Sequence, residues 1–271
     1  MLRSFTYTLP NGSSTALGVD AVGGQADSGD LSEDLTDLLV AAGRAAHERS
    51  TGIVLAIDEV QYLTSAEPAA LISALHRTVQ LNLPVVLVGA GLPQLPGLTG
   101  SAKSYAERLF RFPQIGSLGA EEARDVLKLA VLDAGVTYTR EALDRMLEQS
   151  QGYPYFLQEW GYEVWNVATK SVIDRDAVDR AEPLVRSKLD HNFFLVRMDR
   201  ITPAEKLYLR AMAELGAGPH RSGDIAHRLG VRVESVAPRR SGLITKGMIY
   251  SPAHGDTAFT VPLFDEFLRR Q

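Results

Sequence analysis

The spacing of apolar residues changes along the first half of the chain. Apolar positions recur at helical spacing over 31–50, and again over 66–81. Two unbroken runs of β-branched and aliphatic residues, 52–59 and 83–91, separate and follow these helices. Such runs are typical of parallel strands that are buried on both faces. The alternation of strand, helix and strand predicts an α/β layer with a parallel sheet.

After Pro113 the pattern becomes wholly helical. Four amphipathic segments follow one another with short breaks, over 120–135, 140–152, 154–168 and 175–189. They predict an all-helical domain over 119–200, which would follow a first domain over 1–118.

Residues 201–271 predict a third domain. A helix starts at Thr202-Pro203, with proline at its first position, where it is tolerated. A short helix over 222–230 ends at glycine, and Ser235 is expected to cap a third helix. The final segment predicts a hairpin around a Gly-Asp turn. Three helices and a hairpin are the order of a winged helix-turn-helix.

Composition excludes several classes of protein. The 271 residues are 45% hydrophobic and 23% charged, which is ordinary for a globular protein. No run approaches the roughly 18 apolar residues of a membrane span. The first residues lack the apolar core of a signal peptide, so we expect a cytoplasmic protein with no membrane partner. The absence of cysteine excludes disulfides, Cys-ligated zinc, iron–sulfur clusters and thiol catalysis.

Charge is distributed unevenly. Residues 1–200 hold 18 basic and 26 acidic side chains, whereas 201–271 hold 10 basic and 7 acidic ones, so the net charges are −8 and +3. Six basic residues lie between Arg221 and Lys246, against two acidic ones. This modest basic patch indicates that the C-terminal segment has a separate task.

Asp58 and Glu59 are the strongest chemical signal. They end the first aliphatic strand, and ligands of parallel α/β sheets bind at the carboxyl ends of strands. In P-loop ATPases an aspartate at this point holds Mg²⁺, and a neighbouring acid can polarise the attacking water. A strand end that merely exposes two solvated acids is the alternative.

Around this pair the chain resembles the AAA+ and STAND classes of P-loop ATPases, in the branch near the origin-recognition ATPases. IVLAIDEVQYL resembles the Walker B strand, VVLVGAG the sensor-1 strand, and SYAERLFRF the arginine-finger helix. QGYPYFLQ resembles the Gly-x-Pro element of STAND proteins. The ordered series covers essentially the whole chain. It implies an αβα core, a helical lid and a C-terminal winged helix.

The resemblance assigns roles to four charged residues. Asp58 would be the Mg²⁺ ligand and Glu59 the catalytic base. Arg108, with Arg111 as second choice, would be the finger offered to the nucleotide of a neighbouring subunit, which implies a homo-oligomer. A guanidinium suits that task because it stays charged and can pair with two phosphate oxygens. The alternative for Arg108 is a salt bridge on the helix surface.

The resemblance also implies that Gly152, Tyr153 and Pro154 approach the base and ribose of ATP. A plain turn between two helices is the alternative. We interpret the aromatic residues over 153–165 as the core of the helical domain, not as a cofactor site. The sequence departs from the family at the sensor-1 strand, which ends in Gly89-Ala90-Gly91, and no arginine follows closely after Pro154.

The largest departure concerns the phosphate-binding loop. A Walker A loop needs GxxxxGK[ST], because its backbone amides and lysine surround the phosphates. The chain holds no Gly-Lys dipeptide, and no lysine follows Gly23-Gly24. We therefore expect a truncated core, in a fragment, a chain with a misassigned start or a degenerate member. Mg²⁺ and ATP are the cofactors implied for the intact family, and we do not expect this chain alone to hydrolyse ATP.

Arg239, Arg240 and Lys246 lie on the third helix of the C-terminal segment. If it is the recognition helix, they could contact the phosphates or base edges of duplex DNA. A winged helix that packs on the ATPase core as a regulatory joint is the alternative. The first functional hypothesis is an ATP-gated switch coupled to DNA or a protein partner. The second is a non-enzymatic winged-helix DNA-binding regulator or adaptor with a degenerate ATPase core.

Overall fold

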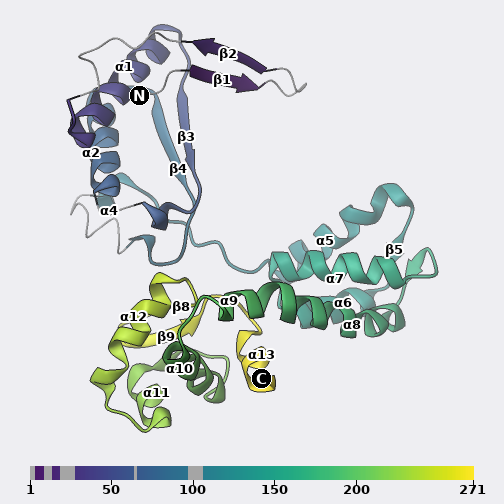
Figure 1. The fold of residues 1–271 in the computed structure, drawn as a ribbon. Coiled ribbons are helices and arrows are strands. Elements are labelled where there is room, and N and C mark those ends of the chain that lie inside the picture. Colours follow the sequence, from purple (N-terminus) through teal and green to yellow (C-terminus); the bar gives the residue numbers. More distant parts are fainter. Residues whose placement is uncertain (1–3, 9–13, 19–27, 64–65, 97–105) are drawn as a thin grey trace. The chain divides into compact units, whose positions relative to one another are not determined.

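The computed structural model describes residues 4–8, 14–18, 28–63, 66–96 and 106–271 (Figure 1). The chain divides into two compact units. Unit 1 covers 1–113 and unit 2 covers 114–271. The helical and C-terminal segments, which the sequence separates at residue 200, thus lie in one unit. The three-domain division stays a prediction.

The described part of unit 1 contains two strand pairs and three helices. In chain order these elements are β1 (Ser4–Thr8), β2 (Ser14–Gly18), α1 (Leu31–Glu48), β3 (Ile53–Ile57), the 3₁₀ turn η1 (Val60–Tyr62), α2 (Glu67–Gln80), β4 (Val85–Gly89) and α4 (Ala106–Leu109). Strands β1 and β2 form an antiparallel pair. The helices and strands predicted over 31–91 are confirmed, with ends that differ by a few residues.

Strands β3 and β4 are parallel, as predicted, from Ile53 opposite Val85 to Ile57 opposite Gly89. Helices α1 and α2 pack on one face of this pair, around Leu39, Leu75 and other buried apolar side chains. The consequence is a two-layer arrangement that leaves the carboxyl ends of both strands accessible.

The opposite face of β3 and β4 is exposed among the described residues. Val54, Val86 and Val88 keep 67%, 56% and 59% of their surface accessible. The prediction that both faces are buried is therefore wrong here, and the described residues supply two layers, not the three of an αβα core. An aliphatic run reports the apolar character of a strand, but not how many layers cover it.

The first part of unit 2 is helical, as predicted. Its elements are α5 (Ala120–Val131), the 3₁₀ turn η2 (Leu132–Ala134), β5 (Thr137–Tyr138), α6 (Arg140–Ser150), α7 (Pro154–Val167), β6 (Val172–Ile173), α8 (Arg175–Leu189), the π-helical turn η3 (Asp190–Leu195) and α9 (Val196–Met198). Thr139 and Asp174 cap α6 and α8 by accepting backbone N–H groups. Among the helices that the structure describes, none is long and apolar enough to cross a lipid bilayer.

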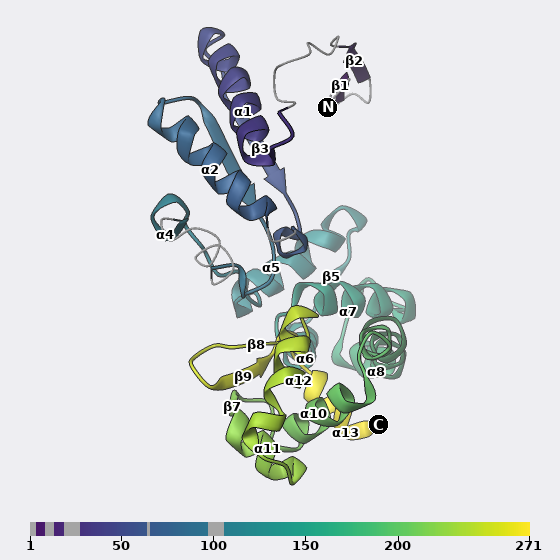
Figure 2. The same cartoon turned by 60° about the vertical axis from the view of Figure 1, so that its left-hand side comes forward.

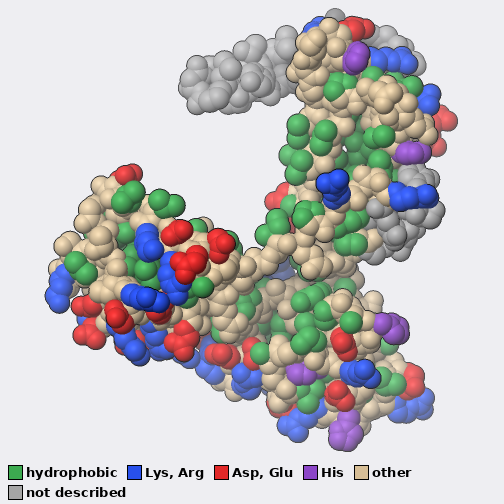
Figure 3. Space-filling view, turned by 180° about the vertical axis from the view of Figure 1, so that it is seen from behind, with side chains coloured by type: hydrophobic (Ala, Val, Ile, Leu, Met, Phe, Trp, Pro, Cys, Tyr) green, Lys and Arg blue, Asp and Glu red, His purple; other side chains and the backbone are tan. Residues whose placement is uncertain are grey.

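Ion pairs cover the outer surface of these helices. Arg145 contacts Glu148, Asp179 and Glu182, which joins α6 to α8, and Arg124 joins α5 to α6 through Asp144. Figure 3 shows the acidic and basic side chains interspersed over this part of unit 2. Such pairs at the surface contribute little stability individually, so the buried apolar face holds the helices together.

The last part of unit 2 contains the predicted three helices and hairpin. Its elements are α10 (Pro203–Glu214), β7 (His220–Arg221), α11 (Ser222–Leu229), the 3₁₀ turn η4 (Val233–Ser235), α12 (Ala237–Thr245), β8 (Ile249–Tyr250), β9 (Asp256–Phe259) and α13 (Phe264–Arg270). The strands form a sheet in the order β7-β9-β8, and the β8–β9 hairpin projects beside the helices (Figure 2). Ser235 does not cap α12, because it ends η4 and Val236 holds the cap position.

One continuous hydrophobic core joins both parts of unit 2. Phe194 in η3 stacks on Phe264 and Phe267 of α13, at centroid distances of 5.5 and 5.0 Å. It also meets Phe156 of α7 edge-on, at 5.7 Å. The C-terminal helices are therefore anchored to the helical part through aromatic packing.

Replacing Phe194 with alanine should remove this anchor. We expect the free energy of unfolding of unit 2 to fall by about 3–5 kcal/mol, because a buried aromatic side chain leaves a cavity. Both tryptophans, Trp160 and Trp165, lie in unit 2, so a urea titration followed by tryptophan fluorescence measures it. Val196→Ala, at an exposed position two residues away, should change it by less than about 0.5 kcal/mol. Equal effects of the two changes would contradict the anchor.

Candidate functional sites

Asp58 and Glu59 follow β3 directly, and both are exposed. One carboxylate oxygen of Asp58, Oδ1, accepts a hydrogen bond from the backbone N–H of Glu59 at 2.8 Å. The side-chain amide of Gln61 donates to the Glu59 carboxylate. The two carboxylates are thus fixed by local contacts, while most of their oxygen lone pairs stay available for a ligand.

The loops after β3 and β4 are bonded to each other. The backbone N–H of Ala90 donates to the Ile57 carbonyl at 2.9 Å, and that of Val60 donates to the Ala90 carbonyl at 3.0 Å. Gln61 Oε1 accepts the backbone N–H of Leu92 at 3.1 Å. Gln61 therefore connects the acidic pair to the end of β4.

Gly91 lets the side chains of Gln61 and Leu95 approach this loop closely, and a larger residue there would displace them. A Cβ atom there would lie 2.5 Å from Gln61 Oε1 and 2.7 Å from a methyl group of Leu95. Sequence reasoning did not single out Gln61. Its place two residues after Glu59 is the only signal, and that spacing does not reveal its contact with the second loop.

Glu59 has a left-handed backbone conformation, with φ of +53°. For a residue other than glycine this conformation costs on the order of 1–3 kcal/mol, and such residues cluster at functional sites. The strained residue here carries an exposed carboxylate at the carboxyl end of a parallel strand. This coincidence strengthens the hypothesis that the pair binds a ligand.

The acidic pair offers oxygen ligands of the kind that Mg²⁺ takes, and its role as a metal site stays a prediction. Magnesium is usually held by one or two carboxylates together with water and substrate phosphates. Among the described residues, no group of three or more His, Asp or Glu side chains could hold a metal alone. Gly23 and Gly24, the glycine-rich stretch considered for phosphate, lie outside the described residues. The pair could therefore hold Mg²⁺ jointly with phosphate oxygens.

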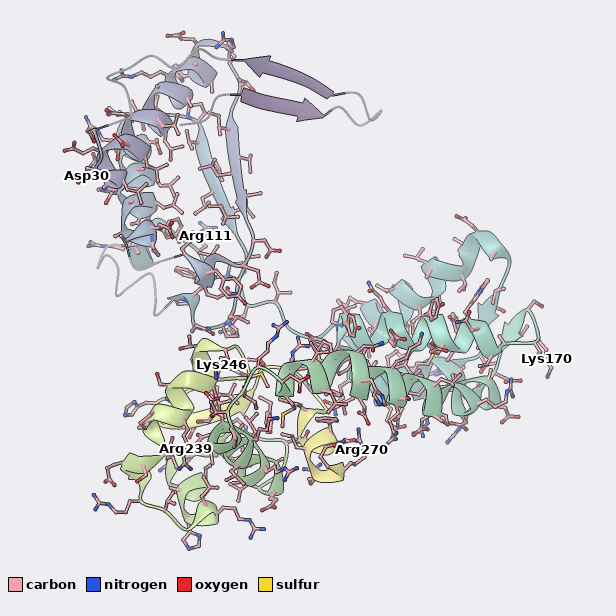
Figure 4. All side chains as sticks on the ribbon, viewed as in Figure 1. Asp30, Arg111, Lys170, Arg239, Lys246 and Arg270 are labelled. Atoms are coloured by element: carbon pink, nitrogen blue, oxygen red, sulfur yellow. The ribbon has the colours of Figure 1, made fainter. Side chains whose placement is uncertain are left out.

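Arg108 and Arg111 lie at and just beyond α4, and both are exposed. Figure 4 labels Arg111. Within the described residues neither arginine makes an ion pair, so the surface salt bridge considered for Arg108 is not seen there. The finger role stays a prediction.

The turn before α7 requires a glycine. Gln151 and Gly152 have φ of +50° and +68°. A Cβ atom on Gly152 would lie 2.4 Å from the Leu118 carbonyl oxygen, while the Leu118 N–H donates to the Gly152 carbonyl at 2.9 Å. Pro154 occupies the first turn of α7, where its missing N–H costs nothing. Gly152 and Pro154 thus have structural reasons to be present, and contact with a nucleotide stays a prediction.

The aromatic residues around this turn differ from the core interpretation. Phe156 and Trp160 are buried, as predicted, but Tyr155 and Trp165 remain 41% and 43% exposed. These two rings lie at the edge of the core and not within it, and Tyr155 stacks on the buried Phe193 with one face while its remaining surface is accessible. Tyr153 is half-buried, with its ring 4.8 Å from that of Phe156.

Arg240 is occupied within the C-terminal segment. Its guanidinium donates to the Thr257 hydroxyl at 2.9 Å, the Ser251 hydroxyl at 2.8 Å and the Asp256 carbonyl at 2.9 Å. It therefore fixes the β8–β9 hairpin to α12. Contact with DNA would have to compete with these three bonds.

Lys246 is occupied as well. Its ammonium donates to both carboxylate oxygens of Glu205, at 3.0 and 2.7 Å, and the Glu205 side chain is only 8% exposed. Arg239, on α12, is half-exposed and makes no ion pair within the described residues. Figure 4 shows Arg239 and Lys246 on the same helical segment. The predicted DNA role of all three residues stays untested by this geometry.

Glu205 also completes a capping box at the start of α10. It accepts the Thr202 backbone N–H at 2.7 Å, and its own N–H donates to the Thr202 hydroxyl at 3.3 Å. Burial by itself would raise the pKa of Glu205, but the hydrogen bonds from Lys246 and Thr202 outweigh it and leave the pKa lowered. The carboxylate is thus stabilised in its charged form.

Comparisons with solved structures found two partial likenesses. A Walker-type ATPase of Pyrococcus abyssi, PABY2304, matches 87% of this chain and 66% of its own, with a TM-score of 0.56 and 17% identity. A RuvB mutant of Thermotoga maritima matches 86% of this chain and 72% of its own, with a TM-score of 0.46 and 20% identity. The first likeness shows that the chain shares the fold of that Walker-type ATPase.

Two sequence comparisons match different lengths of the chain. Residues 191–268 match a family described as a domain of unknown function, DUF8462. An uncharacterized HTH-type transcriptional regulator of Methanocaldococcus jannaschii, MJ0774, is 22% identical over 217 residues, which cover 76% of this chain. The chain spans about half, 52%, of the length of that curated relative.

Lys246→Met should reveal that this lysine stabilises the fold. The change leaves the buried Glu205 carboxylate without its ammonium partner, which should cost about 1–3 kcal/mol of unfolding free energy. Because the pKa of Glu205 is lowered on folding, its contribution is complete above its ordinary value of 4.5 and is lost as the pH falls through the lower folded value. The difference in unfolding free energy between wild type and Lys246→Met should therefore become smaller as the pH falls through the lowered pKa of Glu205.

Chemical denaturation at several pH values measures this gap. Lys170→Met is the control, because Lys170 is an exposed lysine whose ion pair with Asp174 spans 3.6 Å, and we expect it to change stability by less than about 0.5 kcal/mol. A pH-independent gap for Lys246→Met would show that the loss does not come from Glu205.

Proposed function

We propose that the chain is an ATP-binding switch coupled to DNA, and that it does not hydrolyse ATP by itself. The observation that carries the proposal is the exposed pair Asp58 and Glu59. It stands where two parallel strands end, in a chain with a P-loop ATPase-like fold. That edge is where such sheets bind their ligands.

In this proposal Asp58 is the ligand of a Mg²⁺ ion that also contacts nucleotide phosphates. Glu59, held by Gln61, faces the same ion and orients water. For unit 2, taken by itself, the turn at Gly152, Tyr153 and Pro154 is proposed as a contact for the base and ribose of a nucleotide. Hydrolysis is not proposed, because the sequence contains no Gly-Lys dipeptide and therefore no Walker A lysine.

Coupling follows from the shared core of unit 2. The turn at 152–154 leads into α7, whose Phe156 contacts Phe194, and Phe194 contacts α13. A ligand that binds one arrangement of this core better than another shifts the population toward it. The C-terminal segment would report that shift.

The C-terminal segment is proposed to be a winged helix-turn-helix that binds duplex DNA. Its three helices and hairpin have the required order, and the relative MJ0774 is named as an HTH-type regulator. Arg239 is the member of the predicted set that is available for a phosphate. A homo-oligomer, in which Arg108 reaches the nucleotide of a neighbouring copy, completes the proposal.

A non-enzymatic DNA-binding regulator is the second candidate. The observation that favours it is the missing Walker A sequence, together with the name of the curated relative. Both candidates bind DNA, but only the first requires a nucleotide. A nucleotide titration therefore separates them.

Calorimetric titration of MgATP into the purified chain tests the first candidate. We expect saturable binding that Asp58→Asn weakens at least about tenfold, equivalent to about 1.4 kcal/mol, because the substitution removes a charged ligand of the metal. Asp37→Asn, at an exposed acid on α1, should leave the affinity unchanged. Absence of binding by the wild type would favour the non-enzymatic regulator.

A fluorescence anisotropy titration with labelled duplex DNA tests the C-terminal segment. If Arg239 contacts a phosphate, Arg239→Ala should weaken binding to a similar extent across sequences and lower the salt slope by about 1. Arg140→Ala, at an exposed arginine of the helical part, should change neither quantity. Binding that is insensitive to salt, or equal in both variants, would rule out this surface.

A further inference from the structure

An arginine that pairs with no described carboxylate lies next to the turn at 152–154. The guanidinium carbon of Arg197 lies 3.6 Å from the centroid of the Phe193 ring. The exposed Tyr155 ring stacks on the same phenylalanine, at 4.9 Å and an interplanar angle of 24°. Tyr153 meets Phe193 edge-on at 6.2 Å. One ring of the π-helical turn thus joins two tyrosines and a cation.

The charge of Arg197 is not neutralised by the described residues. Its one hydrogen bond there runs from Nη1 to the Phe193 carbonyl at 3.3 Å, and neither Arg197 nor Arg200 forms an ion pair with a described carboxylate. Arg197 is also half-buried. Keeping a cation partly out of water without a counter-charge is costly, so this position favours an anionic ligand.

The electrostatic surroundings agree with the geometry. Burial is the main cause that lowers the pKa of Arg197, the nearby Tyr153 and Tyr155 oppose it, and Arg200 lowers the pKa further. No carboxylate is among these groups. The pKa shift does not discharge the side chain, because a guanidinium stays protonated in proteins.

The π-helical turn accounts for this arrangement. It directs Phe193 toward Tyr155 of α7 and Phe194 toward α13. Residues four apart share a helix face, which places Arg197 over Phe193. π-Helical turns are rare and occur frequently at functional sites.

We propose that Arg197, together with Arg200, binds the phosphate chain of a nucleotide, with Tyr155 as the adjacent aromatic surface. A guanidinium can pair with two phosphate oxygens at once, and the phosphates supply the missing negative charge. The inference rests on the proposed nucleotide contact of the turn at 152–154. A nucleotide fits better than a nucleic-acid strand, because the cations are two residues beside one turn and not an extended row.

The test compares three variants with MgATP, sodium tripolyphosphate and adenosine as separate calorimetric probes. In Arg197→Met, where the methionine can still pack on Phe193, MgATP and tripolyphosphate should bind at least about tenfold more weakly than to wild type. Arg197→Lys keeps the positive charge but loses the guanidinium that can pair with two phosphate oxygens, so it should bind more tightly than Arg197→Met and more weakly than wild type. Arg210→Met removes an equal charge from an exposed position on α10 and should bind like wild type. Adenosine binding should not change.

The outcomes separate this inference from the proposed function. MgATP binding that depends on Asp58 but not on Arg197 would overturn the arginine site and leave the proposed function standing. Tripolyphosphate binding that depends on Arg197, without any MgATP binding, would confirm a phosphate site and contradict its assignment to a nucleotide. If the wild type binds neither probe, both are wrong. Competition of tripolyphosphate by duplex DNA, lost in Arg197→Met, would assign the site to DNA instead. Far-UV circular dichroism verifies that each variant is folded.

Discussion

The aromatic packing around the π-helical turn is the constraint on which unit 2 depends. Phe193 and Phe194 are neighbours in the chain and both contact Phe156 of α7, but Phe193 also stacks on Tyr155, whereas Phe194 stacks on α13. Because protein interiors are closely packed, neither ring can move without displacing the other. As a result, one packed cluster connects the start of α7, Arg197 and the C-terminal helix, and a shift of one of them displaces the others.

This constraint gives a physical basis for switching. The proposed nucleotide contacts of unit 2 and the anchor of the C-terminal segment share the same few rings, so a ligand bound at Tyr155 and Arg197 would act directly on the anchor. Packed cores respond in discrete steps and not by continuous deformation. Within the C-terminal segment, Arg240 fixes the hairpin and Lys246 joins α12 to α10. The segment therefore has the rigidity to move as one piece.

The sequence predicted the elements better than the contacts. Helical and strand periodicity located α1, α2, the four helices of the helical part and the parallel strands β3 and β4, since each pattern lies within one segment. The partner of Lys246 could not be found this way, because Glu205 is 41 residues distant. Gln61 was missed for the same reason, because Leu92 is 31 residues distant. Arg197 was missed although Phe193 is only four residues away, because residue spacing does not reveal the contact of Phe193 with Tyr155. The number of layers that cover the sheet could not be predicted either, because valines such as Val86 and Val88 occur in a strand whether its face is covered or exposed.

Internal contacts of its basic side chains limit how many DNA phosphates the basic patch over 221–246 can bind. Between Arg221 and Lys246, a stretch that the structure describes completely, Arg240 and Lys246 are held by internal bonds, and Arg228 pairs with Glu214. Arg221 and Arg232 pair only loosely with acids and are strongly exposed, so they can exchange an acid for a phosphate at little cost. With Arg239 they leave about three phosphate contacts per chain, fewer than the 6–10 that give strong electrostatic binding. Tight DNA binding would thus require several copies acting together, because linked sites gain from effective concentration, which makes oligomerisation and DNA binding one connected hypothesis.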